Sequence, residues 1–105
     1  MEIYNYNCWV RETNTALLKE RLPKMLQIAG YHIVNYVEHQ FSPEGFTAVW
    51  LLAESHLAIH TYPELKKSYL ELSGCDRDMN QKFKSLVEEG ELTNISNLPA
   101  SIQPD

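Results

Sequence analysis

The apolar run at residues 46–53 constrains the fold most, because it is short, almost unbroken and ends abruptly in polar residues. A run of this kind is typical of a buried β-strand. Reactive side chains at the end of a core strand are typical of a site on a rigid scaffold. The sequence therefore predicts a central strand with a functional site directly after it. The polar stretch carries carboxylates, a hydroxyl and imidazoles, on Glu54, Ser55, His56, His60 and Glu64.

Turn residues divide the rest of the chain into short elements. Ser-Pro-Glu-Gly at residues 42–45 predicts a turn, and Pro63 is expected to end the strand before it. Leu70 and Leu72 should share one face of a late strand. Residues that favour β-structure predict five strands, at residues 2–10, 31–41, 46–53, 55–61 and 68–72.

Apolar residues at helical spacing predict a first helix that ends near Gly30. Thr13 or Asn14 can cap its start, and Gly30 can end it as the residue after the last turn. Pro23 lacks a backbone donor, so it should kink this helix or delay its start. The buried face is expected to contain Leu18, Leu22, Met25, Leu26 and Ala29.

A second helix is predicted after Asp76 or Asp78, either of which can cap it, and Gly90 should close it. The resulting order β-α-β-β-β-β-α predicts an α+β two-layer sandwich, with helices on one face of a mostly antiparallel sheet. The buried stripe of this helix should contain Met79, Phe83, Leu86 and Val87.

The length of 105 residues predicts a single domain, residues 1–105. Residues 91–105 are polar and contain two prolines, which predicts a loose tail. A core this small would gain from dimerisation. The net charge of −5 without a basic cluster argues against a nucleic-acid partner.

No stretch approaches the ~20 apolar residues of a membrane span, and the first residues lack the pattern of a signal peptide. We therefore expect a cytoplasmic protein with no membrane partner. In that reducing compartment a disulfide between Cys8 and Cys75 is disfavoured, and Cys8 is expected to be a buried structural thiol.

The polar stretch carries a family resemblance. Residues 54–64 read Glu-Ser-His-x-x-Ile-His-Thr-Tyr-Pro-Glu, with Cys75 twenty positions after Ser55. Phe-Ser-Pro-Glu-Gly at residues 41–45 also fits. From about Gly30 to Cys75 the chain resembles the prokaryotic S-adenosylmethionine decarboxylases, which are self-cleaving, pyruvoyl-dependent enzymes. The resemblance implies decarboxylation of S-adenosylmethionine to the aminopropyl donor for spermidine, by a homodimer.

The resemblance also implies how the chain would mature. The Ser55 hydroxyl would attack the carbonyl of Glu54 and replace the peptide bond by an ester. Loss of the serine α-proton would then break the ester and leave a pyruvoyl group at position 55. The products would be residues 1–54 and 55–105. The pyruvoyl ketone would form a Schiff base with the substrate amine and accept the electrons released with CO₂.

Other residues receive roles from the same resemblance. His60 would transfer protons during self-cleavage, and Thr47 would stand where relatives use a serine to help processing. Strict alternation places Ser55 and His60 on opposite faces of a strand, so this role of His60 requires a bend near Ser55 or contact across a strand end. Cys75 would return a proton to the substrate α-carbon, which suits a thiol with an ordinary pKa of ~8.5.

Phe41 and Glu64 are the substrate-binding candidates implied by the resemblance. Phe41 would stack on the adenine, and an aromatic face also attracts a sulfonium cation. Glu64 would accept hydrogen bonds from the ribose hydroxyls. No metal is expected, and a metal site built from His56, His60 and Glu64 is disfavoured because Pro63 interrupts the strand.

Besides Thr47 and a first strand in which the family's N-terminal His and pattern are not recognisable, three positions depart from the family pattern and leave alternatives open. Lys66 and Asp76 stand where the family usually has glycine, and Glu71 stands where it usually has aspartate. These changes flank the expected substrate pocket. One alternative is therefore a pyruvoyl decarboxylase of the same fold acting on ornithine or arginine. Another is a relative that never matures and has no enzymatic activity.

Overall fold

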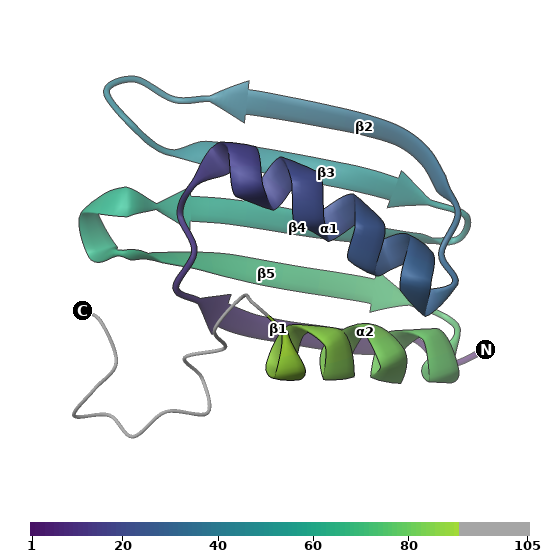
Figure 1. Cartoon of the computed structure of the whole chain (residues 1–105). Helices are drawn as coiled ribbons and strands as arrows, with labels where there is room; N and C mark the ends of the chain where they lie inside the picture. The colour runs from purple at the N-terminus through teal and green to yellow at the C-terminus, as the bar shows by residue number, and fades with distance from the viewer. Residues whose placement is uncertain (91–105) are drawn as a thin grey trace.

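The computed structural model describes residues 1–90, which form a five-stranded sheet and two α-helices (Figure 1). All seven predicted elements are present, and their ends lie within a few residues of the predicted ones. The short 3₁₀ turn η1 was not predicted. The expected loose tail, residues 91–105, lies outside the described residues. The elements are β1 (Tyr4–Val10), α1 (Thr15–Ala29), β2 (Ile33–Gln40), β3 (Phe46–Leu52), β4 (Ser55–Tyr62), η1 (Pro63–Leu65), β5 (Lys67–Gly74) and α2 (Arg77–Glu89).

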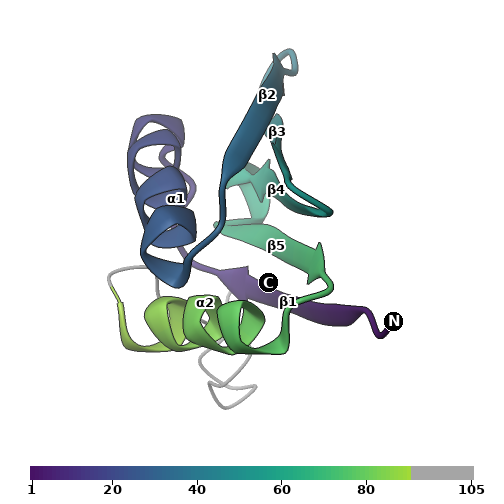
Figure 2. The same cartoon turned by 90° about the vertical axis from the view of Figure 1, so that its right-hand side faces the viewer.

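The strands are ordered β1-β5-β4-β3-β2, and every neighbouring pair is antiparallel. Strands β2 to β5 form a meander, whereas β1 joins the opposite edge because α1 crosses the sheet between β1 and β2. Both helices cover the same face (Figure 2). The predicted α+β two-layer sandwich is confirmed. The middle position belongs to β4, however, and the apolar strand β3 is an interior strand beside it.

The core lies between the helices and one face of the sheet. Residues alternate along each strand, so that every second side chain of β4 and β5 points under the helices. Met25, Met79 and Leu86, which were predicted to be buried, are only partly buried at the margin. The fully buried side chains include Leu18, Leu22 and Leu26 of α1, Leu57 and Ile59 of β4, Leu70 and Leu72 of β5, and Phe83 and Val87 of α2.

The helix ends follow the capping residues in the sequence. The side chains of Asn14 and Asp76 accept hydrogen bonds from backbone N–H groups three residues further on, at 3.1 and 2.9 Å. Gly30 ends α1 with φ 108°, a left-handed conformation that glycine adopts without steric cost. Pro23 lies inside α1, and the predicted delay of the helix start is wrong because the helix already begins at Thr15.

The opposite face of the sheet is not covered by any described element (Figure 2). One cross-strand row on this open face contains Trp9, Tyr69, His60, Thr47 and His39. The Trp9 and Tyr69 ring centroids are 5.1 Å apart. An aromatic row on an uncovered face is the kind of surface that a partner would bury.

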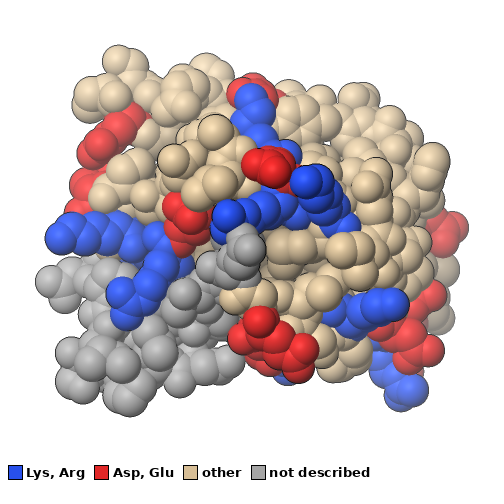
Figure 3. All heavy atoms as spheres, viewed as in Figure 1, with Lys and Arg blue, Asp and Glu red and all other residues tan. Residues whose placement is uncertain are grey.

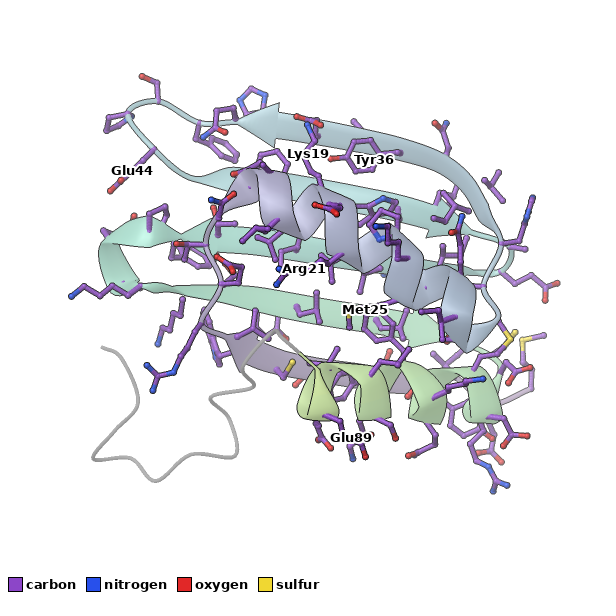
Figure 4. All side chains as sticks on the ribbon, viewed as in Figure 1. Lys19, Arg21, Met25, Tyr36, Glu44 and Glu89 are labelled. Atoms are coloured by element: carbon purple, nitrogen blue, oxygen red, sulfur yellow. The ribbon has the colours of Figure 1, made fainter. Side chains whose placement is uncertain are left out.

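Charged side chains of both signs are interspersed over the helical face (Figure 3). One ion pair links α1 to the edge strand β2, where Lys19 Nζ lies 2.8 Å from Glu38 Oε1. The Tyr36 hydroxyl donates to the same carboxylate oxygen at 2.9 Å (Figure 4). The hydrogen bonds from Lys19 and Tyr36 lower the pKa of Glu38. None of the helices formed by residues 1–90 is long and apolar enough to span a membrane.

We predict that Leu22→Ala lowers the free energy of unfolding by about 2–5 kcal/mol, because it opens a cavity under α1. Leu22 is fully buried. Ile28→Ala is the matched control on the same helix, since Ile28 is 56% exposed, and it should change stability by less than ~0.5 kcal/mol. Urea denaturation followed by circular dichroism measures both, and equal losses would contradict the assigned core.

Candidate active site

The residues singled out in the sequence fall into two groups at opposite ends of β4. The serine end is defined by Glu54, Ser55, Gly74 and Cys75. The histidine end is defined by Phe41, Thr47, His60 and Glu64. Each group contains residues from different elements. The pairing of the strands, rather than proximity in the sequence, brings these elements together.

The serine end is built on the tight hairpin between β3 and β4, in which Leu52 pairs with Ser55. Glu54 lies in this turn with φ 61°. A residue with a Cβ adopts this left-handed conformation only at a steric cost of roughly 1–2 kcal/mol. Ser55 is the first residue of β4, is 9% exposed and belongs to the face under the helices. The backbone strain therefore falls on the residue whose carbonyl the serine would attack.

Cys75 joins the serine end from the link between β5 and α2. Its thiol donates a weak hydrogen bond to Glu54 Oε2, with Sγ and Oε2 3.6 Å apart. The thiol is half-buried. The other cysteine, Cys8, is buried in β1, and burial raises the pKa of its thiol. Both are free, and Cys75 is the accessible one of the two.

Gly74 allows the closest approach in the serine end. A Cβ placed on Gly74 would lie 2.5 Å from Ser55 Oγ and 3.1 Å from Ser55 Cβ. The Ser55 side chain thus occupies the space that any other residue at position 74 would fill. In the sequence, Gly74 was noted only as the residue before Cys75. Its contact with Ser55 depends on the pairing of β4 with β5, which the sequence does not show.

The histidine end is a cleft of about 590 Å³. Thr47 of β3 and His60 of β4 are cross-strand partners, and Thr47 Oγ1 lies 2.9 Å from His60 Nδ1. The Tyr69 ring stacks beside His60, with centroids 6.5 Å apart. These contacts orient the imidazole on the open face. The cleft is lined by Phe41, Glu44, Gly45, Phe46, Thr47, His60, Thr61, Tyr62 and Glu64.

The two substrate-binding candidates line the same cleft. Phe41 begins the β2–β3 turn, is 49% exposed and contacts His39 edge to face. Glu64 belongs to η1 and is exposed. Glu44 projects from the tip of the β2–β3 turn (Figure 4) and adds a second carboxylate that the sequence analysis did not single out. An exposed aromatic ring beside carboxylates suits a ligand with a flat base and hydroxyl groups.

The two ends do not meet within one chain. β4 keeps an unbroken register with both neighbours from its first residues to its last. The bend near Ser55 that a role for His60 in the same chain requires is therefore absent. Five residues of extended strand separate Ser55 from His60 by about 17 Å, and the two side chains lie on opposite faces of the sheet.

The remaining motif residues have structural explanations. His56 is exposed on the open face, and no group of three or more metal-ligating side chains occurs among residues 1–90. Lys66 has φ 56°, a left-handed conformation that glycine would adopt freely. Asp76 caps α2, and Glu71 accepts a hydrogen bond from the Tyr69 hydroxyl at 3.3 Å.

Comparison with known proteins gives consistent matches. The sequence model of the S-adenosylmethionine decarboxylase family matches residues 4–96. The S-adenosylmethionine decarboxylase proenzyme of Prochlorococcus marinus (strain MIT 9211) is 33% identical over 81 residues, covering 76% of this chain and 66% of that protein. The proenzyme of Syntrophomonas wolfei is 46% identical over 52 residues, covering 50% of this chain and 41% of that protein.

The fold also matches a solved structure. The crystal structure of the adenosylmethionine decarboxylase from Aquifex aeolicus aligns with a TM-score of 0.68 at 19% identity, over 90% of this chain and 86% of that one. The chain belongs to the S-adenosylmethionine decarboxylase family, because the family model matches well over half of its length. It spans about two thirds of the length of the Prochlorococcus relative.

We predict that Gly74→Ala destabilises the protein by about 1–3 kcal/mol, because the new Cβ must displace the Ser55 side chain. Ser73→Ala is the control at the adjacent position, whose side chain belongs to the open face, and it should change stability by less than ~0.5 kcal/mol. Chemical denaturation measures both. A Gly74→Ala protein as stable as the control would show that position 74 has room for a side chain.

Proposed function

We propose that this protein is a pyruvoyl-dependent S-adenosylmethionine decarboxylase that matures by cleaving itself between Glu54 and Ser55. The observation that carries the proposal is the serine end, where a strained Glu54 precedes a buried serine and the Cys75 thiol lies 3.6 Å from the Glu54 carboxylate. Membership of the family supports the same conclusion.

Self-cleavage would begin when Ser55 Oγ attacks the Glu54 carbonyl carbon. The C–N bond is replaced by a C–O ester bond, and the left-handed strain at Glu54 is available for release. Loss of the Ser55 α-proton to a base then expels the Glu54 carboxylate. Hydrolysis of the remaining dehydroalanine releases ammonia and leaves the pyruvoyl group. The products are residues 1–54 and 55–105.

The serine end fits a small group of this kind, because the absence of a Cβ on Gly74 leaves space against position 55. When formed, the pyruvoyl group supplies a carbonyl that binds the substrate amine and accepts the electrons released with CO₂. Cys75 would remain beside the new start of β4 and return a proton to the substrate α-carbon. Glu54 would become a chain end and free the thiol from its carboxylate.

The proposed assembly is a homodimer in which the serine end of one chain meets the histidine end of the other. One chain separates these ends by about 17 Å on opposite faces of its sheet, so a second copy is needed to bring His60 to Ser55. The uncovered face, with the aromatic rings of Trp9 and Tyr69 in its cross-strand row, gives that copy a surface to bury. Phe41 and the cleft would then lie near the subunit interface.

The proposed substrate is S-adenosylmethionine, and its product is the aminopropyl donor for spermidine synthesis. Phe41 presents an exposed ring for the adenine or the sulfonium cation. Glu64 lines the same cleft and provides acceptors for the ribose hydroxyls. Ornithine and arginine, which lack an adenosine, would leave both residues unused. The cytoplasm is the proposed compartment, because two free thiols suit a reducing environment.

We predict that the purified wild-type protein yields two fragments, residues 1–54 and a pyruvoyl-blocked 55–105, and that Ser55→Ala stays full length because it lacks the attacking oxygen. Intact-mass spectrometry over time measures this. Ser73→Ala is the matched control, since it removes a hydroxyl from the cross-strand partner of His56, on the open face of the neighbouring strand, and should cleave like wild type. A single full-length wild-type mass after prolonged incubation would exclude maturation by this route.

We further predict that co-expression restores cleavage between two inactive variants. Cleavage of the Ser55→Ala chain should be blocked, and cleavage of the His60→Ala chain should be slowed by on the order of 10²–10⁴. In a mixed dimer, the Ser55 of the His60→Ala chain meets the intact His60 of the other chain, so only the His60→Ala chain should be cleaved. The two chains differ in mass, which identifies the cleaved one. If neither chain is cleaved in the mixture although both single variants fold, the proposal of a site shared between two chains is wrong.

A further inference from the structure

Tyr31 has no role in the site described so far, yet its hydroxyl lies beside that site. The residue follows Gly30 at the end of α1, and its backbone N–H donates to the Leu26 carbonyl at 2.9 Å. Its side chain is only 4% exposed. Among the side chains of residues 1–90, the Tyr31 hydroxyl is the one buried polar group without a hydrogen-bond partner. A buried hydroxyl without a partner is unfavourable and calls for an explanation.

The surroundings of the Tyr31 hydroxyl provide an explanation. The point at which a Cβ of Gly74 would sit lies 3.6 Å from the Tyr31 hydroxyl oxygen and 2.5 Å from Ser55 Oγ. The two hydroxyls therefore flank the same small space over Gly74. A catalytic hydrogen bond that is not formed in the resting protein commonly tightens only as the reaction proceeds.

The protonation state of Tyr31 suits a donor. Burial is the main cause that raises the pKa of the Tyr31 hydroxyl to about 12, with smaller contributions from the neighbouring Asp76 and Cys75. The hydroxyl thus keeps its proton at neutral pH. It can donate a hydrogen bond to an oxygen that gains negative charge, but it does not act as a base.

We propose that the Tyr31 hydroxyl donates a hydrogen bond to the Ser55 oxygen while the Glu54 carboxylate leaves, which makes Tyr31 a further catalytic residue of self-cleavage. The inference rests on the proposed function, because it assigns a residue to the second step of that reaction. Nothing in the sequence motif points to position 31, whose hydroxyl lies near Ser55 only because the tertiary fold brings the link between α1 and β2 to Gly74 at the end of β5.

The step balances without another reactant. In the ester, the Ser55 oxygen is bonded both to Ser55 Cβ and to the Glu54 carbonyl carbon. The Ser55 α-proton passes to a base, His60 of the second copy, and the C–H electron pair forms the Cα=Cβ double bond. The Cβ–O bond breaks, and its electron pair stays on the oxygen, which becomes part of the Glu54 carboxylate. Tyr31 keeps its proton and stabilises that developing charge.

The test compares Tyr31→Phe with Tyr36→Phe in the full chain. Tyr36→Phe is the matched control because its hydroxyl donates to Glu38 at the sheet edge, away from the serine end. We expect Tyr31→Phe to form fragments about 10²-fold more slowly than wild type, and Tyr36→Phe to cleave normally. The ester should accumulate in Tyr31→Phe. Hydroxylamine should then cut it and yield a 55–105 fragment that begins with serine instead of pyruvoyl.

Thermal unfolding separates this role from a structural one. Removing an unpaired buried hydroxyl leaves the packing of the ring intact, so the unfolding midpoint of Tyr31→Phe should equal or exceed that of wild type. Normal cleavage by Tyr31→Phe, slow cleavage without a trapped ester, or a lowered midpoint would each overturn the role of Tyr31 while leaving maturation in place. A wild-type chain that never cleaves would overturn the proposed function, and with it the role of Tyr31.

Discussion

The pleat of β4 is the constraint on which the rest of the structure depends. Successive side chains of an extended strand point to opposite faces, so β4 places Ser55, Leu57 and Ile59 under the helices and His60 on the open face. Because β4 is the middle strand and pairs without interruption on both sides, its register cannot shift by one residue without exposing the core. The separation of the two halves of the site is therefore fixed by the same alternation that holds the core together.

The serine end gathers the structural features on which the proposed self-cleavage depends. The hairpin leaves Glu54 in a left-handed conformation, and Gly74 lets the Ser55 side chain approach the neighbouring strand closely. The same corner contains the Cys75 thiol and the unpaired Tyr31 hydroxyl. The strain at Glu54 and the unsatisfied Tyr31 donor each disfavour the folded state. Their concentration at one turn is typical of a site whose geometry serves chemistry rather than stability.

The uncovered face is the observation that supports the proposed homodimer. Two helices cover one side of the sheet, and no described element covers the other. On that side the aromatic row and the cleft of about 590 Å³ belong to one continuous surface, because His60 and Thr47 contribute to both. A second copy would bury this surface and bring the histidine end to a serine end, so assembly and maturation would depend on the same contact.

The sequence by itself determined the features that depend on neighbouring residues. Asn14, Gly30 and Asp76 mark the helix ends because capping is local, and the strand ranges follow from side-chain alternation. The sequence also predicted the family, which the family model confirms, and it singled out Ser55 and Cys75 as the residues of the proposed chemistry. Tertiary structure alone decided that Gly74 lies against Ser55, that Tyr31 reaches the same corner and that His60 lies beyond the reach of Ser55 in one chain. These relations depend on which strand pairs with which and on how α1 packs, and no local pattern encodes a contact between residues so far apart in the chain.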